Sequence, residues 1–216
     1  MALQRKKFAA VWPKVALFYF CAIFPLGFIL PPQAGWENGP IEMLQNFVLL
    51  LGVFQSLYYY SKPTYPSRDK GWLCAAGLYL LLFGREISWG RVFFVKGITE
   101  NGPVFWSMRS LPYHQLIHAG VGLYLLLLLV FIFKTIRWRT VRQCLQWSRS
   151  TTVLLLLCSV LALLGDKGPL LNGFINETTE ELAELLIYLN LLYFTGQYKK
   201  LTTAGSLPCT DDSPAS

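Results

Sequence analysis

Charged residues are scarce in this sequence. Only 14% of its 216 residues are Asp, Glu, Lys or Arg, and 54% are hydrophobic, whereas an ordinary soluble domain is about 25% charged. This composition argues against a water-soluble globular fold, a disordered chain, collagen and a coiled coil. The apolar residues are gathered into long runs, which leave no room for a separate soluble domain.

The signatures of several common site types are also missing. The five cysteines are widely spaced and form no CxxC pair, so no disulfide framework is indicated. The chain has no P-loop, no GxSxG elbow, no GxGxxG loop and no Glu-x-x-His pair. Gln115 follows His114 where the HExxH metalloprotease motif needs Glu. The two histidines lie in one apolar run, which argues against a haem bound between two helices.

Six apolar runs are present, and each approaches the length of about 20 residues that a helix needs to cross a membrane. They cover residues 11–30, 41–60, 72–90, 112–133, 150–166 and 177–196. We therefore expect an all-α, polytopic membrane protein with six transmembrane helices in one domain, residues 1–200. Residues 201–216 contain Ser, Thr and Pro and predict a disordered cytoplasmic tail.

The basic residues cluster in alternate connections between these runs, as the positive-inside rule requires. With both termini cytoplasmic, the cytoplasmic side holds 14 basic and 3 acidic residues, and the opposite side holds 5 basic and 9 acidic residues. The net charge of +7 is then explained by topology, and we expect the lipid bilayer, not nucleic acid, as the partner. In a bacterium the protein would lie in the inner membrane.

Ionisable residues inside the predicted spans form the main functional signal, because such residues are expensive in a membrane unless they are paired. A helix rises about 1.5 Å per residue. In five of the predicted helices, one polar residue therefore lies about 22–25 Å from the basic residue at the cytoplasmic end of the same helix. These groups are Asn46, Glu86, His118, Asp166 and Glu184. We expect them to meet in one polar layer near the extracytoplasmic surface.

Two groups of side chains in this layer have the spacing of a metal site. His114 and His118 lie at i, i+4 and share a helix face. Four acids at the start of the sixth run lie within an arc of about 100°: Glu177, Glu180, Glu181 and Glu184. We expect both histidines and the last three acids to hold a divalent metal such as Zn²⁺, Mn²⁺ or Fe.

This site predicts a metal-dependent hydrolase or transferase that acts on a lipid or envelope precursor. Glu86 is the candidate general base, and Ser88 is a candidate nucleophile or polarising group. Arg85 and Arg91 are candidates to bind an anionic headgroup. Residues 91–111 form a short loop that we expect to lie over the polar layer as a lid.

Two alternatives to a metal site remain open at this point. The acids can be compensated without metal by an ion-pair network with Arg85, Arg91, Arg109 and Lys167. Acids at the start of the sixth run can instead be solvated and favoured by the helix dipole. The function is then either non-catalytic assembly or partner binding, or a proton-coupled permease that uses the carboxylates as a relay. The permease is less well supported, because the inner halves of the runs carry almost no polar residue.

The segment Glu86-Ile87-Ser88-Trp89-Gly90-Arg91 resembles a motif of uncharacterised bacterial multi-spanning membrane proteins. In that motif an acidic pair precedes Ile-Ser-Trp-Gly and Gln-Arg follows; here Arg85 replaces the first acid and Arg91 replaces Gln. The resemblance implies the fold and the membrane location but no activity. A looser resemblance to alkaline ceramidase-like membrane hydrolases implies a zinc site of histidines, an acid and a serine inside a helical bundle, although such sites use three histidines.

Overall fold

A computed structural model describes residues 2–62, 69–99, 102–136, 138–147, 149–166 and 177–204. Most of these residues, 84%, are helical. The helices are α1 (Ala2–Ile29), α2 (Pro40–Ser61), α3 (Gly71–Glu86), α4 (His114–Thr135), α5 (Trp138–Trp147), α6 (Arg149–Asp166) and α7 (Glu177–Ala204). An antiparallel hairpin of β1 (Val95–Thr99) and β2 (Gly102–Phe105) lies between α3 and α4. Three-residue 3-10 turns occur at Pro32–Ala34 and Met108–Ser110, and a longer one at Ser88–Phe93.

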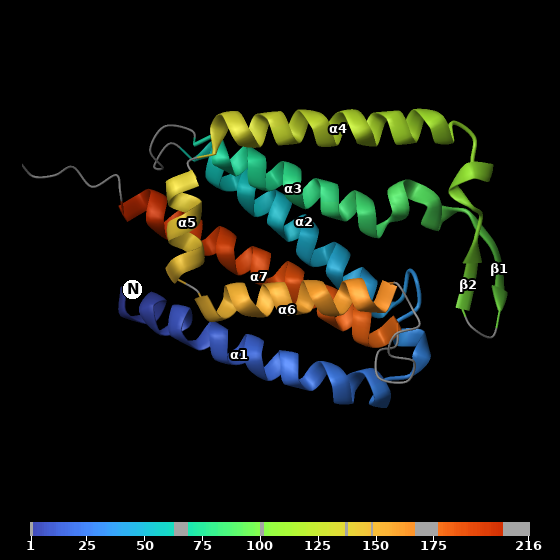
Figure 1. The fold of residues 1–216 in the computed structure, drawn as a ribbon, viewed down its shortest axis with the longest axis horizontal. Helices are drawn as coiled ribbons and strands as arrows, with labels where there is room; N and C mark the ends of the chain where they lie inside the picture. Colours follow the sequence, from blue (N-terminus) through green and yellow to red (C-terminus); the bar gives the residue numbers. More distant parts are fainter. Residues whose placement is uncertain are drawn as a thin grey trace, which may run out of the picture.

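All helices except α5 run along the length of the molecule and alternate in direction from one to the next (Figure 1). The short helix α5 crosses one end of this bundle, and the hairpin projects from the other; we call these the α5 end and the hairpin end. Both the beginning of α1 and the end of α7 lie at the α5 end (Figure 1). The acid-rich start of α7 therefore lies at the hairpin end.

Each of the six predicted spans coincides with a helix, although the third ends at Glu86 instead of residue 90, and two connections contain structure that we did not expect. The connection after residue 133 contains α5, whose apolar residues Val141, Cys144 and Leu145 recur at i, i+3 and i+4 on one helix face. The predicted loop 91–111 contains the hairpin, and β1 is exposed along its whole length. Helix α7 continues to Ala204, so the first residues of the predicted tail are helical; the rest of the tail is outside the described residues.

Three of the helices are long and apolar enough to cross a membrane: Val11–Ile29 within α1, α2 and α4. Helix α6 is apolar but shorter over Arg149–Gly165. Large apolar side chains cover the outer faces of the bundle, including Phe18, Phe54 and Leu126, which are all more than half exposed. A surface of this kind is typical of a protein surrounded by lipid rather than water.

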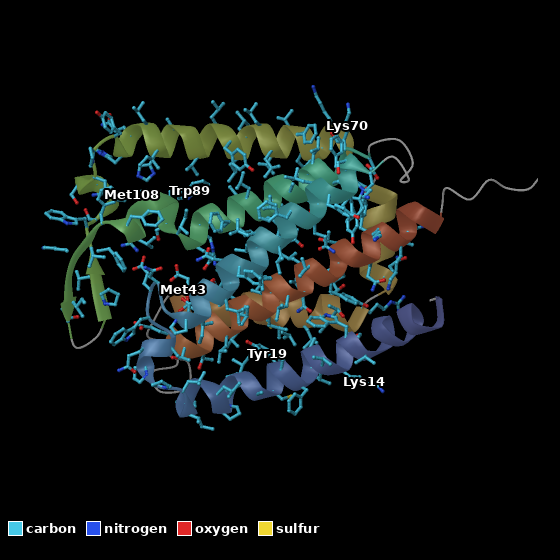
Figure 2. All side chains as sticks on the ribbon, turned by 180° about the vertical axis from the view of Figure 1, so that it is seen from behind. Lys14, Tyr19, Met43, Lys70, Trp89 and Met108 are labelled. Carbon is cyan, nitrogen blue, oxygen red and sulfur yellow. The ribbon has the colours of Figure 1, made fainter. Side chains whose placement is uncertain are left out.

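Helix α7 lies at the centre of the bundle and packs against α1, α2, α5 and α6. Its apolar side chains Leu186 and Ala183 are fully buried in the main core. Its polar side chains also point inward, since Asn190 accepts a hydrogen bond from the Trp12 indole at 3.1 Å and Thr195 bonds Tyr79 at 2.7 Å. Helix α4 packs mainly on α3 at the edge, and Leu128 is its only buried residue among those described. Figure 2 shows the side chains around this arrangement from the opposite side.

Candidate functional site

The segment that follows α3 forms a tight turn at the hairpin end. Ser88, Trp89 and Gly90 all have positive φ angles, of 44°, 52° and 94°, which is uncommon for residues other than glycine. The turn folds the Trp89 ring back onto α3 at Gly84, where an added Cβ would lie 2.5 Å from the ring. The Gly-Arg-Glu-Ile-Ser-Trp-Gly sequence therefore ends α3 and fixes the direction of the next segment.

This turn is tied to the connection between α1 and α2 through Glu37. The Arg91 guanidinium forms an ion pair with the Glu37 carboxylate, and the Ser88 hydroxyl donates to the same carboxylate at 3.3 Å. Both Arg91 and Glu37 are partly buried. The predicted serine and arginine thus hold the turn in place beside the acids of α7.

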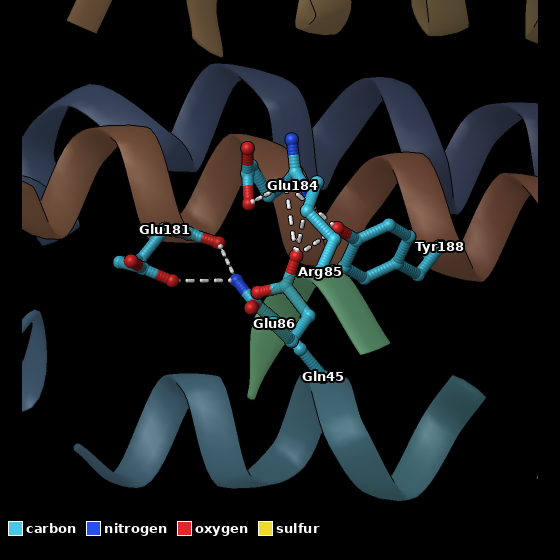
Figure 3. Close-up of polar contacts among 6 residues, drawn as sticks. All are labelled: Gln45, Arg85, Glu86, Glu181, Glu184 and Tyr188. Carbon is cyan, nitrogen blue, oxygen red and sulfur yellow. Dashed lines mark hydrogen bonds and ion pairs between the residues drawn. The ribbon is translucent and has the colours of Figure 1, made fainter. Parts of the chain in front are cut away.

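An ion-pair group lies next to the turn, at the interface of α3 and α7 (Figure 3). Arg85 Nη2 lies 2.8 Å from Glu86 Oε1 and 2.5 Å from Glu184 Oε2. The Tyr188 hydroxyl donates to Glu86 Oε1 at 2.5 Å and accepts from Arg85 at 2.9 Å. The carboxylates of Glu86 and Glu184 are mostly buried, whereas Arg85 is about half exposed. One guanidinium therefore compensates two buried acids.

A third acid joins this group through α2. Gln45 is fully buried and donates from Nε2 to the Glu181 backbone oxygen at 2.7 Å and to Glu181 Oε2 at 2.8 Å (Figure 3). Glu86, Glu181 and Glu184 each place a carboxylate oxygen within 4.8 Å of the others. This spacing suits a shared cation, because carboxylate oxygens bind hard divalent ions at about 2.0–2.6 Å.

These acids line a cavity of about 640 Å³ between α3, α6 and α7. Its described lining contains six glutamates and one arginine: Glu37, Glu42, Glu86, Glu180, Glu181, Glu184 and Arg85. Leu82, Ala162 and Leu163 provide part of its apolar wall. Several carboxylates that lie close together need cations or protons to compensate them, and Arg85 with Arg91, which pairs with Glu37, supplies only two positive charges for these six acids.

Glu42 gives the clearest indication that the cavity takes a further ligand. Only 3% of this residue is exposed, and its Oε1 atom has no hydrogen-bond partner. Its other carboxylate oxygen accepts a hydrogen bond from the Asn38 backbone N–H at 2.5 Å. A buried carboxylate oxygen without a partner costs free energy, so a cation or a donor group in the cavity would stabilise it.

The structure does not bring the two histidines to these acids. His114 and His118 share a face of α4, as expected, with ring centroids 6.4 Å apart. However, α4 packs on the opposite side of α3 from α7 (Figure 1), and neither histidine belongs to the lining of the cavity or to the cluster of candidate metal ligands in the described chain. The equal depth of the histidines and acids along the helices did not bring them to the same face of the bundle.

The other predicted site residues are placed as follows. Ser88 and Glu180 line the cavity. Glu177 is exposed at the start of α7, outside the lining, and Arg109 is also exposed. Asn46 is partly buried on α2 and its Oδ1 atom has no hydrogen-bond partner. The Asp166 side chain and Lys167 are outside the described residues. No residue of the predicted lid, 91–111, is among the described residues that line the cavity.

Four residues that line the cavity or bond its acids were not predicted from the sequence: Glu37, Glu42, Gln45 and Tyr188. Two signals in the sequence could have found most of them. Glu42 and Gln45 lie at i, i+3 within a predicted span, which places both on one helix face. Tyr188 follows Glu184 at i+4 and so extends the acidic face of α7 by one turn.

Comparison with protein family models, curated proteins and solved structures finds no match to this chain.

Proposed function

We propose that this chain is a membrane protein of six spans, formed by α1, α2, α3, α4, α6 and α7, and that its acidic cavity binds a divalent cation for hydrolysis or group transfer on a lipid or envelope substrate. The alternating direction of the six helices and the common end of both termini support this topology. Both termini then lie in the cytoplasm, because basic residues such as Lys70 and Lys199 belong to the α5 end. In a bacterium this would be the inner membrane.

Helices α3, α6 and α7 are shorter or more polar than typical membrane-spanning helices, and their neighbours in the bundle explain how they can still cross the membrane. Helix α7 carries many polar residues, but it is central, so these residues face other helices instead of lipid. Helix α3 has only 16 residues, or about 24 Å, and the turn at Ser88–Phe93 extends it toward the membrane surface. Helix α6 lies against α7 and α1, which reduces the surface that it presents to lipid.

The observation that carries the cation proposal is the excess of carboxylates in the cavity, together with the unpartnered Oε1 atom of Glu42. Glu86, Glu181 and Glu184 are the ligands that we propose, since their oxygens lie within reach of one ion. A ligand set of oxygen atoms alone suits Mg²⁺ or Mn²⁺ better than Zn²⁺. The histidines are not included in this ligand set.

A divalent cation in this position would activate water and stabilise negative charge on a reacting group. The protein groups around it have separate roles. Arg85 lies at the cavity wall and is the group best placed to contact an anionic part of the substrate. Glu42 replaces Glu86 as the candidate general base, because we assign Glu86 to the cation, while Glu42 belongs to the cavity lining and its Oε1 atom has no hydrogen-bond partner. Ser88 holds Glu37 and the turn, so we assign it a positioning role.

A second candidate function is supported by a specific observation. Arg85 contacts Glu86, Glu184 and Tyr188 at once, and such a network can hold α3 against α7 without any metal. In that case the protein is a non-catalytic assembly or partner-binding protein. A permease is less well supported. A second cavity, nearer the α5 end and lined by residues such as Leu78, Cys144 and Phe194, is almost entirely apolar and offers no relay for ions.

Metal binding to the purified protein separates these candidates. Protein stripped with a chelator and reloaded with Mn²⁺ should retain stoichiometric metal, measured by elemental analysis after desalting. Glu181→Gln should weaken Mn²⁺ binding at least about ten-fold. Glu177→Gln is the matched control, because it makes the same change on the same helix at an exposed position outside the cavity. The double variant His114→Ala, His118→Ala should bind as the unmodified protein does.

Two results would contradict the proposal. One is Mn²⁺ content no higher than that of a detergent blank in a protein that still shows its normal thermal transition. The other is an equal loss of metal in Glu177→Gln and Glu181→Gln, which would indicate general surface charge rather than a site. Either result favours the structural ion-pair network.

A further inference from the structure

A second cavity, of about 250 Å³, lies toward the α5 end of the bundle. It is bounded by α3, α5 and α7, with smaller contributions from α4 and α6, and its walls include Ala75, Cys144 and Phe194. The few hydroxyl groups in its wall are already used, since Tyr79 bonds Thr195 at 2.7 Å and Tyr198 bonds Asp69 at 2.7 Å. The cavity therefore presents an apolar surface to whatever enters it.

The two cavities lie on the same faces of the same three helices. On each helix a residue that lines the acidic cavity is followed, one turn nearer the α5 end, by a residue that lines the apolar cavity. These pairs are Leu82 and Leu78 on α3, Ser159 and Leu155 on α6, and Ile187 and Leu191 on α7. Because residues four apart share a helix face, the two cavities follow one another along α7 between α3 and α6, and we call the two together the groove along α7.

The groove has the polarity and the length of one lipid molecule. From Glu184 in the acidic part to Tyr198 at the far end of the apolar part is about 21 Å along α7, and half of a bilayer with its headgroup regions is about 20–22 Å. Its acidic part contains one arginine among six glutamates. A headgroup that carries both a phosphate and an ammonium group complements this lining, since the phosphate can contact Arg85 and the ammonium can contact a carboxylate such as Glu42.

We propose that the groove along α7 binds one phospholipid with a phosphate–ammonium headgroup, with the headgroup in the acidic cavity and one acyl chain in the apolar cavity. The tip of this chain contacts α5 at Val141, Cys144 and Leu145. The inference deepens the proposed function by naming its substrate class, and it rests on that function only for the role of the cation. Helix α5 then closes the inner end of a lipid site.

Photocrosslinking in vesicles tests this proposal on the unmodified full-length protein. Two forms of phosphatidylethanolamine are used, one with a diazirine at the end of an acyl chain and one with a diazirine next to the ester. The terminal diazirine should label Trp138–Trp147 and the part of α7 around Phe194. The diazirine near the ester should label α3 near Leu82 and α6 near Ser159. Peptide mass spectrometry locates the labels.

A blocking variant and a headgroup exchange sharpen the test. Ala75→Trp fills the apolar cavity and should reduce terminal labelling at least about five-fold. Ala119→Trp, the same change at an exposed position on α4, should leave it unchanged. A phosphatidylglycerol with the same chain and diazirine should label the groove several-fold less than the phosphatidylethanolamine. Thermal transitions of both variants check that they remain folded.

The outcomes separate this inference from the proposed function. Labels spread over the outer faces of α2 and α4, with no dependence on the diazirine position, would overturn the lipid site even if Mn²⁺ binds. Equal labelling by both headgroups would overturn the headgroup assignment. Position-dependent labelling in a protein that binds no Mn²⁺ would support the lipid site and overturn the metal-dependent reaction.

Discussion

Helices α4 and α7 show opposite relations between sequence and position. Helix α4 is the most apolar of the three helices that can cross a membrane, yet it lies at the edge of the bundle with one buried residue among those described. Helix α7 carries Glu177, Glu180, Glu181 and Glu184 and several polar residues further along, yet it lies at the centre. The polar side chains of α7 therefore face other helices, whereas the apolar side chains of α4 lie on the outer surface of the bundle.

This comparison explains which part of the predicted site formed. Acids on α7 meet acids on α2 and α3 because all three helices contribute to the interior. His114 and His118 lie on a helix that contacts the bundle mainly through α3, so they remain apart from the acids. Depth along a helix decides whether two groups lie at the same level, but the direction that each helix faces decides whether they meet.

The first test compares core truncations on the two helices and has the largest expected effect. Leu186 is fully buried on α7, so Leu186→Ala should lower the free energy of unfolding by about 2–5 kcal/mol. Leu126 is exposed on α4, and Leu126→Ala should change it by no more than about 0.5 kcal/mol. Reversible unfolding in mixed micelles measures both. Equal losses would show that α4 is packed as tightly as α7, against another copy or another protein.

The second test asks whether the exposed face of α4 contacts lipid. Leu126 is near the middle of α4, and Leu126→Lys should cost about 3 kcal/mol of membrane insertion, because a lysine at the centre of a spanning helix is unfavourable. Acceptor sites for glycosylation on either side of α4 report insertion in microsomes. Gln143→Lys on α5 is the control and should have no effect. Unchanged insertion of the Leu126→Lys variant would contradict a lipid-facing position for α4.

The third test compares one hydroxyl group on each helix. Tyr188 donates to the buried Glu86 carboxylate at 2.5 Å, so Tyr188→Phe should destabilise the protein by about 1.5–3 kcal/mol. Tyr124 on α4 donates to the Gly77 carbonyl at 2.8 Å, and Tyr124→Phe should cost about 0.5–1.5 kcal/mol. Unfolding in mixed micelles again provides the measurement. A larger effect at Tyr124 would reverse the comparison between the centre and the edge.

Most of the fold could be predicted from hydropathy, and the site only in part. Each of the six runs coincides with a helix, and three of these helices are long and apolar enough to cross a membrane, where a helix is one of the few stable conformations. The acids of α7 were predicted to share a face, and three of them line the cavity. Arg85 and Glu86 were predicted to lie with these acids, and both do. Glu42 and Gln45 were not found, because they belong to α2 and only helix packing brings them to Glu181. The left-handed turn at Ser88–Gly90 and the hairpin were also missed, because neither produces a recognisable hydropathy pattern in the sequence.

The last test examines α5, the short helix that packs against the end of α7. Cys144 is 5% exposed where α5 packs against the end of α7, and burial raises the pKa of its thiol to about 11. The reactive thiolate is therefore rare at neutral pH, and its fraction increases about ten-fold per pH unit until the pH reaches that value. We expect maleimide to label Cys144 slowly at pH 8 in a variant without the other four cysteines. The rate at pH 9 should be about ten-fold that at pH 8, and the rate at pH 10 about ten-fold that at pH 9. A rate that levels off near pH 8.5, as for an ordinary exposed thiol, would mean that α5 does not pack on α7 in the membrane, and the inner end of the proposed lipid groove would then be open.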